Sequence, residues 1–184
     1  EEYEFGSPEE QKFSVDRYEE MIRNEDQYFF DAKAFEGIIE YYIEKNDAIK
    51  ALQVADYAIK QHPFETTFLL KKAQLLATVQ HFDLAMAYLD KAEMLEPSDA
   101  DIYLIKGTIY ASQGNMEPAE ANFFKALELG DVKDEIYYQL AGLYQIQGDY
   151  DKAVKYLKKT LELNMENQDA LYELGFCYDI LDKQ

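Results

Sequence analysis

Three glutamates, Glu36, Glu40 and Glu44, follow one another at intervals of four residues, which places their carboxylates on one face of a helix. Like charges at this spacing destabilise a helix by about 0.2–0.5 kcal/mol per pair. Two hypotheses account for the row: it is a solvated helix surface, or it binds Lys and Arg side chains of a partner. Two carboxylates could also serve as the acid and base of a glycosidase, but the sequence places no pair in a closed cleft.

Nucleophilic and metal-ligating residue types are scarce in this chain. The two histidines, His62 and His81, are expected in solvated turns, and the single cysteine, Cys177, is expected as a small core residue. One cysteine and two histidines are too few for a cysteine-based or a three-histidine zinc site. The sequence contains no glycine-rich phosphate-binding loop, no H-E-x-x-H motif and no nucleophile with an adjacent base. We therefore predict that the chain is not an enzyme and holds no cofactor and no metal.

The charge balance restricts the class of partner. The 184 residues include 37 acidic and 18 basic ones, giving a formal net charge of −19 at pH 7. A surface this acidic repels phosphate groups, which argues against nucleic acid and anionic membranes as partners. No uncharged run is long enough for membrane insertion. The sequence starts without Met and without a basic-then-apolar leader, so we expect a cytoplasmic protein or a piece of one.

The elements that position these residues recur every 34 residues. Without any insertion the chain divides into residues 32–65, 66–99, 100–133 and 134–167 and a partial block, 168–184. Block position 20 is alanine in all four complete blocks: Ala51, Ala85, Ala119 and Ala153. Positions 4, 8 and 11 share one face of a first helix, and positions 20, 24 and 27 share one face of a second. Small residues at positions 8 and 20 allow the two helices to approach closely.

Turn residues separate the two helices of a block. A turn residue followed by a helix N-cap occurs at Asn46-Asp47, Gly114-Asn115 and Gly148-Asp149. Position 32 is proline in the first two blocks, where a helix cannot continue, and Asp131 and Met165 stand there in the next two. The sequence therefore predicts an all-α fold of stacked antiparallel helix pairs, with helices of roughly 12–14 residues and about 20 Å in length.

This pattern of large residues at positions 4, 11 and 24, small residues at 8, 20 and 27 and proline at 32 resembles the tetratricopeptide repeat (TPR) family. The resemblance covers residues 32–184 and is best in 100–133, which contains Tyr103, Gly107, Tyr110, Ala119, Phe123 and Ala126. Lys72 and Lys106 depart from it at position 7, which is usually apolar, and Ala55 departs from it at position 24. The resemblance implies a right-handed α-solenoid, a TPR-like superhelix, that acts by binding other proteins.

In that family, positions 2, 5, 9, 12 and 13 of the first helices line a concave groove that holds ligands. Carried over to this chain, the groove is acidic at one end, small and polar in the middle, and aromatic at the other end. The residues predicted to bind a partner are Glu36, Glu40, Glu44, Leu70, Lys71, Gln74, Leu104, Thr108, Tyr138, Gln145, Tyr172 and Phe176. Family members that clamp chaperone C-terminal carboxylates use Lys and Asn at positions 2, 5, 6 and 9. Only Lys33 and Lys71 stand at such positions here, so we predict no carboxylate clamp.

Residues 1–31 precede the repeats and carry eleven acids against three bases. Ser7, Pro8 and Glu10 form the start of a helix with a capping box, and this helix is expected to run to about Arg23. Asp31 is then the N-cap of the next helix, with Phe30 spaced to pack on Phe35. We interpret this segment as an acidic N-terminal arm with a capping helix.

The partial last block stops at Gln184, before a second helix, so Leu171, Gly175 and Tyr178 lack the helix that would cover them. We expect either a fragment of a longer chain or self-association through this open repeat. Taken together, the sequence predicts a protein-interaction scaffold that binds a basic or neutral peptide or protein segment in its groove. The alternative is a structural or oligomerisation module of a larger protein with no groove ligand, and an enzyme using groove carboxylates is the least favoured interpretation.

Overall fold

The computed structural model describes residues 7–130 and 133–182. Within these residues the chain forms ten helices and no strand, which confirms the all-α fold class. The helices divide between two compact units, unit 1 (Glu1–Glu96) and unit 2 (Pro97–Gln184). Residues 1–6 of the predicted acidic arm, Asp131 and Gln184 lie outside the described residues.

Helix α1 (Pro8–Asn24) of unit 1 begins and ends close to the predicted positions. The backbone N–H of Glu10 donates to the Ser7 hydroxyl (3.3 Å), and the Glu10 carboxylate accepts from the backbone N–H of Ser7 (3.1 Å). These two hydrogen bonds confirm the capping box. The helix ends at Glu25, whose φ of 55° lies in the left-handed region and turns the chain away from the helix axis.

Unit 1 continues with two helix pairs, α2 (Ala32–Glu44) with α3 (Ala48–Gln61), and α4 (Thr66–Thr78) with α5 (Phe82–Leu95). The Asp31 side chain accepts a hydrogen bond from the backbone N–H of Ala34 (2.8 Å), which confirms it as the N-cap of α2. The rings of Phe30 and Phe35 lie 5.3 Å apart between centroids, so the predicted packing across this helix start is also confirmed.

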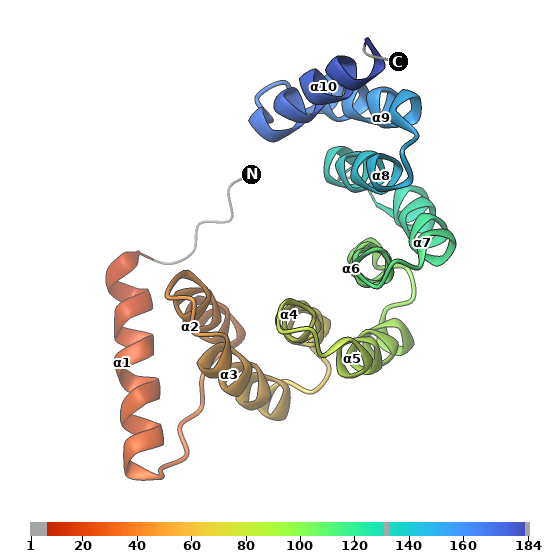
Figure 1. Ribbon diagram of the computed structural model, residues 1–184. Coiled ribbons are helices and arrows are strands. Elements are labelled where there is room, and N and C mark those ends of the chain that lie inside the picture. Colours follow the sequence, from red (N-terminus) through yellow and green to blue (C-terminus); the bar gives the residue numbers. More distant parts are fainter. Residues whose placement is uncertain (1–6, 131–132, 183–184) are drawn as a thin grey trace. The chain divides into compact units, whose positions relative to one another are not determined.

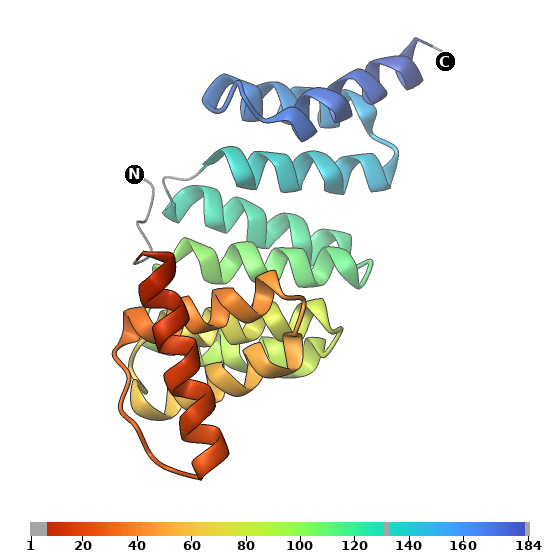
Figure 2. The ribbon, with the colours of Figure 1, turned by 90° about the vertical axis from the view of Figure 1, so that its left-hand side faces the viewer.

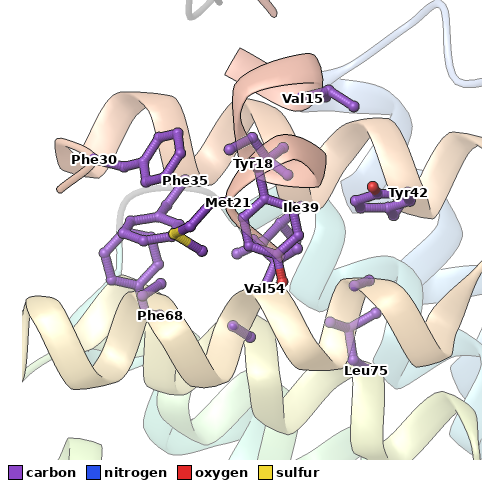
Figure 3. Close-up of a cluster of buried hydrophobic side chains, with 14 residues drawn as sticks. Val15, Tyr18, Met21, Phe30, Phe35, Ile39, Tyr42, Val54, Phe68 and Leu75 are labelled. Atoms are coloured by element: carbon purple, nitrogen blue, oxygen red, sulfur yellow. The ribbon is translucent and has the colours of Figure 1, made fainter. Parts of the chain in front are cut away.

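Apolar side chains of α1 cover the helices that follow it (Figure 3). Val15, Tyr18 and Met21 are almost completely buried and pack with residues of α2 and α3. The same cluster extends into α4, and its members from α2 to α4 include Phe35, Ile38, Ile39, Tyr42, Ala51, Val54, Phe68 and Leu75. Because α1 supplies three of the buried residues, it is an integral part of the core of unit 1.

The segment between α1 and α2 is held by the end of α3. The Gln61 amide accepts from the backbone N–H of Phe30 (3.0 Å) and donates to the backbone carbonyl of Tyr28 (2.8 Å). His62 Nε2 lies 2.8 Å from the Phe30 carbonyl, and its ring packs against Phe35 and Phe68. The expectation of a solvated His62 was therefore wrong, because the turn folds onto the phenylalanine cluster. His81 is exposed, as expected.

Unit 2 contains α6 (Ala100–Ser112), α7 (Met116–Leu129), α8 (Lys133–Gln147), α9 (Tyr150–Leu163) and α10 (Gln168–Leu181) (Figures 1 and 2). Helices α6 and α7 form one antiparallel pair, α8 and α9 form the next, and α10 packs on α9. Gly114 and Gly148, both with φ of 77°, turn the chain between paired helices, where a side chain would be strained. No described helix is both long and apolar enough to cross a membrane.

The repeat columns fulfil the packing roles predicted for them. All four alanines of position 20 are fully buried. At Gly107, a Cβ atom would lie 2.6 Å from two ring carbons of Phe123, so this position must be glycine for α7 to sit this close to α6. The prediction of small residues facing large ones across a helix pair is therefore confirmed in the best-matching block.

Lys72, one of the departures from the family pattern, is buried in unit 1, whereas its ion-pair partner Asp56 is 62% exposed. Its ammonium group forms an ion pair with Asp56 of α3 and donates to the Tyr88 hydroxyl of α5 at 2.8 Å. Burial by itself lowers the pKa of Lys72, but the hydrogen bonds to Asp56 and Tyr88 outweigh it and raise the pKa above its ordinary value. Position 7 therefore tolerates a lysine here because the two neighbouring helices, α3 and α5, supply partners for the charge. Lys106 at the same position is also buried.

Candidate functional site

The glutamate row lies along α2 in unit 1. Glu36 and Glu40 are half-buried and Glu44 is exposed. Glu40 forms an ion pair with Lys71 of α4, so two of the residues predicted to bind a partner instead bind each other. The row therefore presents two acidic side chains separated by a neutralised one, rather than three free carboxylates.

Next to this ion pair is a cavity of about 290 Å³ between α2, the start of α3 and α4. It brings together three of the predicted residues, Glu40, Lys71 and Gln74. Ile43 and Thr78 also line it, as does the turn residue Asn46 at the end of α2, which the sequence analysis used only as a turn signal. Leu70 lies on the same helix as Lys71 but is 8% exposed, so it contributes to the core of unit 1 and not to an open surface.

In unit 2, the predicted residues of α6 offer little to a partner. Leu104 is half-buried. The hydroxyl of Thr108 donates to the Leu104 carbonyl (3.0 Å), and the Ser112 hydroxyl donates in turn to the Thr108 carbonyl (2.9 Å). Because these hydroxyls already donate hydrogen bonds within their own helix, they are not available as donors to a ligand. The side chains in this part of the surface are small, and they are polar in type only.

Exposed apolar side chains gather on α8 and α10. Tyr172 is 75% exposed, Phe176 is 46% exposed and Ile146 of α8 is 65% exposed. Tyr138 is half-buried, and the Cβ position of Gly142, one turn further along α8, has no atom within 4 Å. Exposed aromatic rings and open space over a glycine are each features of a surface that receives an apolar side chain.

Gln145 has a structural use that the sequence did not indicate. Its amide donates to the Glu173 carboxylate (2.9 Å) and to the sulfur of Cys177 (3.2 Å), and it thereby links α8 to α10. Cys177 is fully buried, which confirms the prediction of a core residue. Gln145 therefore holds the two helices that carry Tyr138, Tyr172 and Phe176 against each other.

Acidic residues at repeat position 2 stand at the starts of α6, α8 and α10: Asp101, Glu135 and Asp169. Burial and the nearby charge of Asp99 raise the pKa of Asp101. Burial, followed by the charges of Asp101 and Asp134, raises the pKa of Glu135. Among the described residues no Lys or Arg forms an ion pair with these three acids. This edge of unit 2 therefore concentrates negative charge that no Lys or Arg of the described residues neutralises.

Acidic residues of α10 also lie near the aromatic residue Tyr138 of α8. Burial raises the pKa of Tyr138, and the charges of Asp169 and Glu173 raise it further, which places this hydroxyl near the acids of α10. Aromatic rings and unneutralised carboxylates thus share one surface of α8 and α10. Within the described residues no three His, Cys, Asp or Glu side chains gather as metal ligands.

Comparison with protein families identifies the class of fold that carries these surfaces. Residues 70–132 match one tetratricopeptide repeat family model, and residues 134–167, the span of the fourth block, match a second one. Together the two matches cover more than half of the chain. The chain belongs to the tetratricopeptide repeat family, and its fold class is that of the TPR solenoid proteins.

Solved TPR structures share this fold at low sequence identity. A thermophilic TPR protein of Thermus thermophilus, TTC0263, is 20% identical, with 94% of this chain and 99% of that chain covered and a TM-score of 0.76. The first TPR of Spaghetti (RPAP3), bound to an HSP90 peptide, is 19% identical over 64% of this chain and 96% of that one, with a TM-score of 0.60. YrrB, described as a TPR protein with an unusual peptide-binding site, is 17% identical, with coverages of 95% and 84% and a TM-score of 0.56. Comparison with curated proteins gave no match.

Proposed function

We propose that this chain is a protein-interaction scaffold that binds a basic and partly apolar segment of a partner on the surface of α8 and α10. The observation that carries the proposal is the exposure of Tyr172 and Phe176 on α10, the helix that also carries Asp169 and Glu173, which form no ion pair within the described residues. The similarity of fold to one TPR structure with a bound peptide and to another described as having a peptide-binding site supports a binding role in general. The chemistry of the ligand is argued from the side chains of this chain alone.

The acidic residues of this surface decide which charge the ligand must carry. Burial raises the pKa of both Asp101 and Glu135, and the charges of neighbouring carboxylates raise it further, so a Lys or Arg side chain of a ligand placed near them would counter both effects. The aromatic rings then take an adjacent apolar side chain over Gly142. A carboxylate-bearing ligand would meet repulsion on this surface. This surface therefore favours a positively charged ligand, whereas a carboxylate clamp binds a negatively charged one.

Residues of unit 1 contribute a second, smaller binding site to the proposed function. Glu36 and Glu44 remain available to a basic segment, whereas Glu40 and Lys71 form the charged wall of the cavity beside Gln74. We propose that this cavity takes one side chain of a partner. Its walls are Ile43 on one side and polar groups on the other, which suits a side chain with an apolar stem and a polar end.

A peptide-array experiment tests the proposed function. The labelled chain is applied to immobilised peptides that combine Lys or Arg with Leu or Phe, and to peptides in which Asp or Glu replaces the basic residues. We expect binding to the basic set only, weakening as salt rises, and lost in the Tyr138→Ala/Tyr172→Ala variant. Phe64→Ala, which removes an exposed aromatic ring from unit 1, is the matched control and should bind as the parent does. Equal binding to both peptide sets, or full binding by the double variant, would favour a structural module with no groove ligand.

Self-association is a second candidate function, and the observation that favours it is the exposure of Leu171 (51%) and Tyr178 (40%) on α10. Contact between two copies through this face would bury both side chains. Sedimentation equilibrium tests it directly: Leu171→Glu should convert a concentration-dependent dimer into a monomer. A monomer at all concentrations for the parent chain removes this candidate.

A further inference from the structure

The cavity between α2, the start of α3 and α4 has a wall that carries no net charge. Glu40 and Lys71 line it, and the Lys71 ammonium group pairs with Oε1 of Glu40. Within the part of the chain that the structure describes, no other residue bonds to either group. The Glu40 carboxylate can therefore accept a further hydrogen bond, and the Lys71 ammonium group can donate one. The wall thus offers an acceptor beside a donor.

Two carboxamides complete the polar lining of the cavity. Gln74 and Asn46 are both exposed, and no described residue bonds to either side-chain amide. Thr78 offers no donor, because its hydroxyl already donates to the Gln74 backbone carbonyl at 3.0 Å. Each carboxamide has an oxygen that accepts and a nitrogen that donates. The polar side chains of the cavity therefore present donors and acceptors together, with no net charge.

The remaining lining is apolar. Leu75 is buried in the core cluster of unit 1, Ile43 is exposed and Ala48 is half-buried. Side chains of this kind are favourable contacts for the methylene groups of a ligand. The volume of about 290 Å³ lies below the usual range of small-molecule sites, about 300–1,000 Å³, so the cavity fits a single side chain.

A charged side chain fits this cavity poorly. A Lys or Arg would stand beside the Lys71 ammonium group, and an Asp or Glu would stand beside the Glu40 carboxylate. Either one gains a partner only by displacing a member of an ion pair that is mostly buried, which leaves the displaced group uncompensated. A carboxamide adds no charge, and it accepts from Lys71 while it donates to Glu40. Gln carries its carboxamide on two methylene groups, which the apolar lining covers.

The charges on either side of the cavity restrict the neighbours of that Gln. Glu36 and Glu44 stand four residues before and after Glu40, at about 6 Å along the helix axis. No described Lys or Arg forms an ion pair with either, and Lys45, next to Glu44 in the chain, lies over the Tyr41 ring. In an extended segment, side chains two residues apart share a face and lie about 6.6 Å apart. A segment along α2 with Gln at Glu40 therefore places the residues two positions before and after it beside Glu36 and Glu44.

We propose that unit 1 binds an extended segment of a partner with the pattern Lys/Arg-x-Gln-x-Lys/Arg, with the Gln side chain in the cavity. The two basic side chains pair with Glu36 and Glu44. The carboxamide bonds to Glu40, Lys71 and Gln74 without separating the ion pair. This inference rests on the proposed function, because it specifies the segment that the smaller site of unit 1 takes. The ligand of α8 and α10 differs, since the exposed aromatic rings there favour an apolar side chain.

The probes are labelled peptides with Lys at both outer positions of the pattern, Gln, Glu, Lys or Leu at its centre, and Gly and Ser elsewhere. They are titrated into the full 184-residue chain carrying Tyr138→Ala and Tyr172→Ala, so that the surface of α8 and α10 does not contribute, and fluorescence anisotropy reports binding. We expect the Gln peptide to bind about tenfold more tightly than the Leu peptide, which makes no hydrogen bond to the ion pair. The Lys peptide should also bind more weakly than the Gln peptide, although it carries one more positive charge. Moving both lysines one position outward should weaken the Gln peptide, because their side chains then face away from α2.

Variants of the chain assign the preference to the cavity. Lys71→Met leaves Glu40 as an unpaired acceptor, so it should reverse the preference and make the Lys peptide bind more tightly than the Gln peptide. Lys33→Met, which removes an exposed lysine from α2, is the matched control and should keep the preference for Gln. Gln74→Ala should weaken the Gln peptide, whereas Gln53→Ala, on the surface of α3 outside the cavity, should not.

The inference is overturned if any other peptide binds as tightly as the Gln peptide, or if no peptide binds saturably at millimolar concentration. It is also overturned if Lys71→Met, shown to be folded by circular dichroism, keeps the preference for Gln. The proposed function fails on a different observation, namely full binding of the basic, apolar peptides by the Tyr138→Ala/Tyr172→Ala variant. Because the measurements on unit 1 use that variant throughout, each proposal can fail while the other stands.

Discussion

Glu40 of α2 and Lys71 of α4 form an ion pair in which both side chains are mostly buried, at 30% and 20% exposure. The pair joins two helices of unit 1 and forms one wall of the cavity beside Gln74. It also changes the meaning of the glutamate row, because the central charge is already neutralised. The acidic surface of unit 2 is therefore the better candidate site for a basic ligand.

Lys71→Ala tests this interpretation. The substitution leaves Glu40 half-buried without its cation, so we expect a loss of about 1 kcal/mol in the free energy of unfolding, measured with urea. It also restores three adjacent carboxylates on α2, so weak binding of a Lys-rich peptide to unit 1 should increase. Lys33→Ala is the control, since Lys33 is exposed on α2; it should change stability by much less. Equal stability of the two variants would show that the pair contributes nothing.

Lys72 and Asp56 give the second prediction. Asp56→Asn removes the negative charge that faces the buried ammonium group of Lys72, and because Asp56 is itself 62% exposed we expect a loss of about 1 kcal/mol in the free energy of unfolding of unit 1. Lys72→Met removes the charge and keeps most of the volume, and it should be neutral or stabilising, since position 7 is usually apolar in this family. Urea unfolding of both variants is the measurement. A larger loss from Lys72→Met than from Asp56→Asn would contradict this account.

The raised pKa of Glu135 gives a prediction about pH. A carboxyl whose pKa is higher in the folded state opposes folding when ionised, so its cost is full above the folded pKa and vanishes below the unfolded one. Glu135→Gln should therefore stabilise the chain at pH 7, and the gain should disappear as the pH falls through about 4.5. Urea unfolding at both pH values measures it.

The control for this prediction is Glu117→Gln, which removes a carboxylate from the first turn of α7 as Glu135→Gln does from α8. Both variants lose the same favourable interaction with a helix N-terminus. Only Glu135 faces Asp101 and Asp134, so only its variant should gain stability at neutral pH. A gain of equal size from both variants would assign the effect to something other than repulsion.

Local signals in the sequence were sufficient for the helix pairs. Two of these signals, the Ser7 capping box and the Asp31 N-cap, depend only on residues close together in the chain. The buried alanines form one column of the repeat, so they too can be recognised from a single sequence. The family resemblance then assigned the large and small positions correctly at Gly107 and Phe123.

The candidate site was harder to predict because its contacts join distant residues. Glu40 and Lys71 are 31 residues apart, and Gln145 reaches Cys177 over 32. No helix pattern indicates that these side chains meet each other and not a ligand. His62 was misjudged for the same reason, since the Phe30 carbonyl that it contacts lies 32 residues earlier. The family resemblance assigned Tyr172 and Phe176 of α10 to groove positions, and both side chains are exposed.

Gly107 and Gly175 occupy the same repeat position and should respond to alanine in opposite ways. At Gly107 the added methyl group would lie 2.6 Å from ring atoms of Phe123, which is 1% exposed and has no room to move. Overpacking of this kind costs about 1–3 kcal/mol, and the better helix propensity of alanine returns about 1 kcal/mol. We therefore expect Gly107→Ala to destabilise unit 2 in urea unfolding.

Gly175→Ala gains helix propensity and meets no atom within 4 Å, so it should stabilise unit 2 by up to about 1 kcal/mol. Both glycines lie inside helices, so backbone effects cancel between the variants and the difference measures the opposing Phe123 ring alone. Adding Phe123→Leu to Gly107→Ala should recover part of the loss, because the smaller side chain makes room for the methyl group. Equal destabilisation by both alanine variants would contradict this account. It would mean that the added methyl group at Gly175 meets other atoms in solution and that this position on α10 is not open.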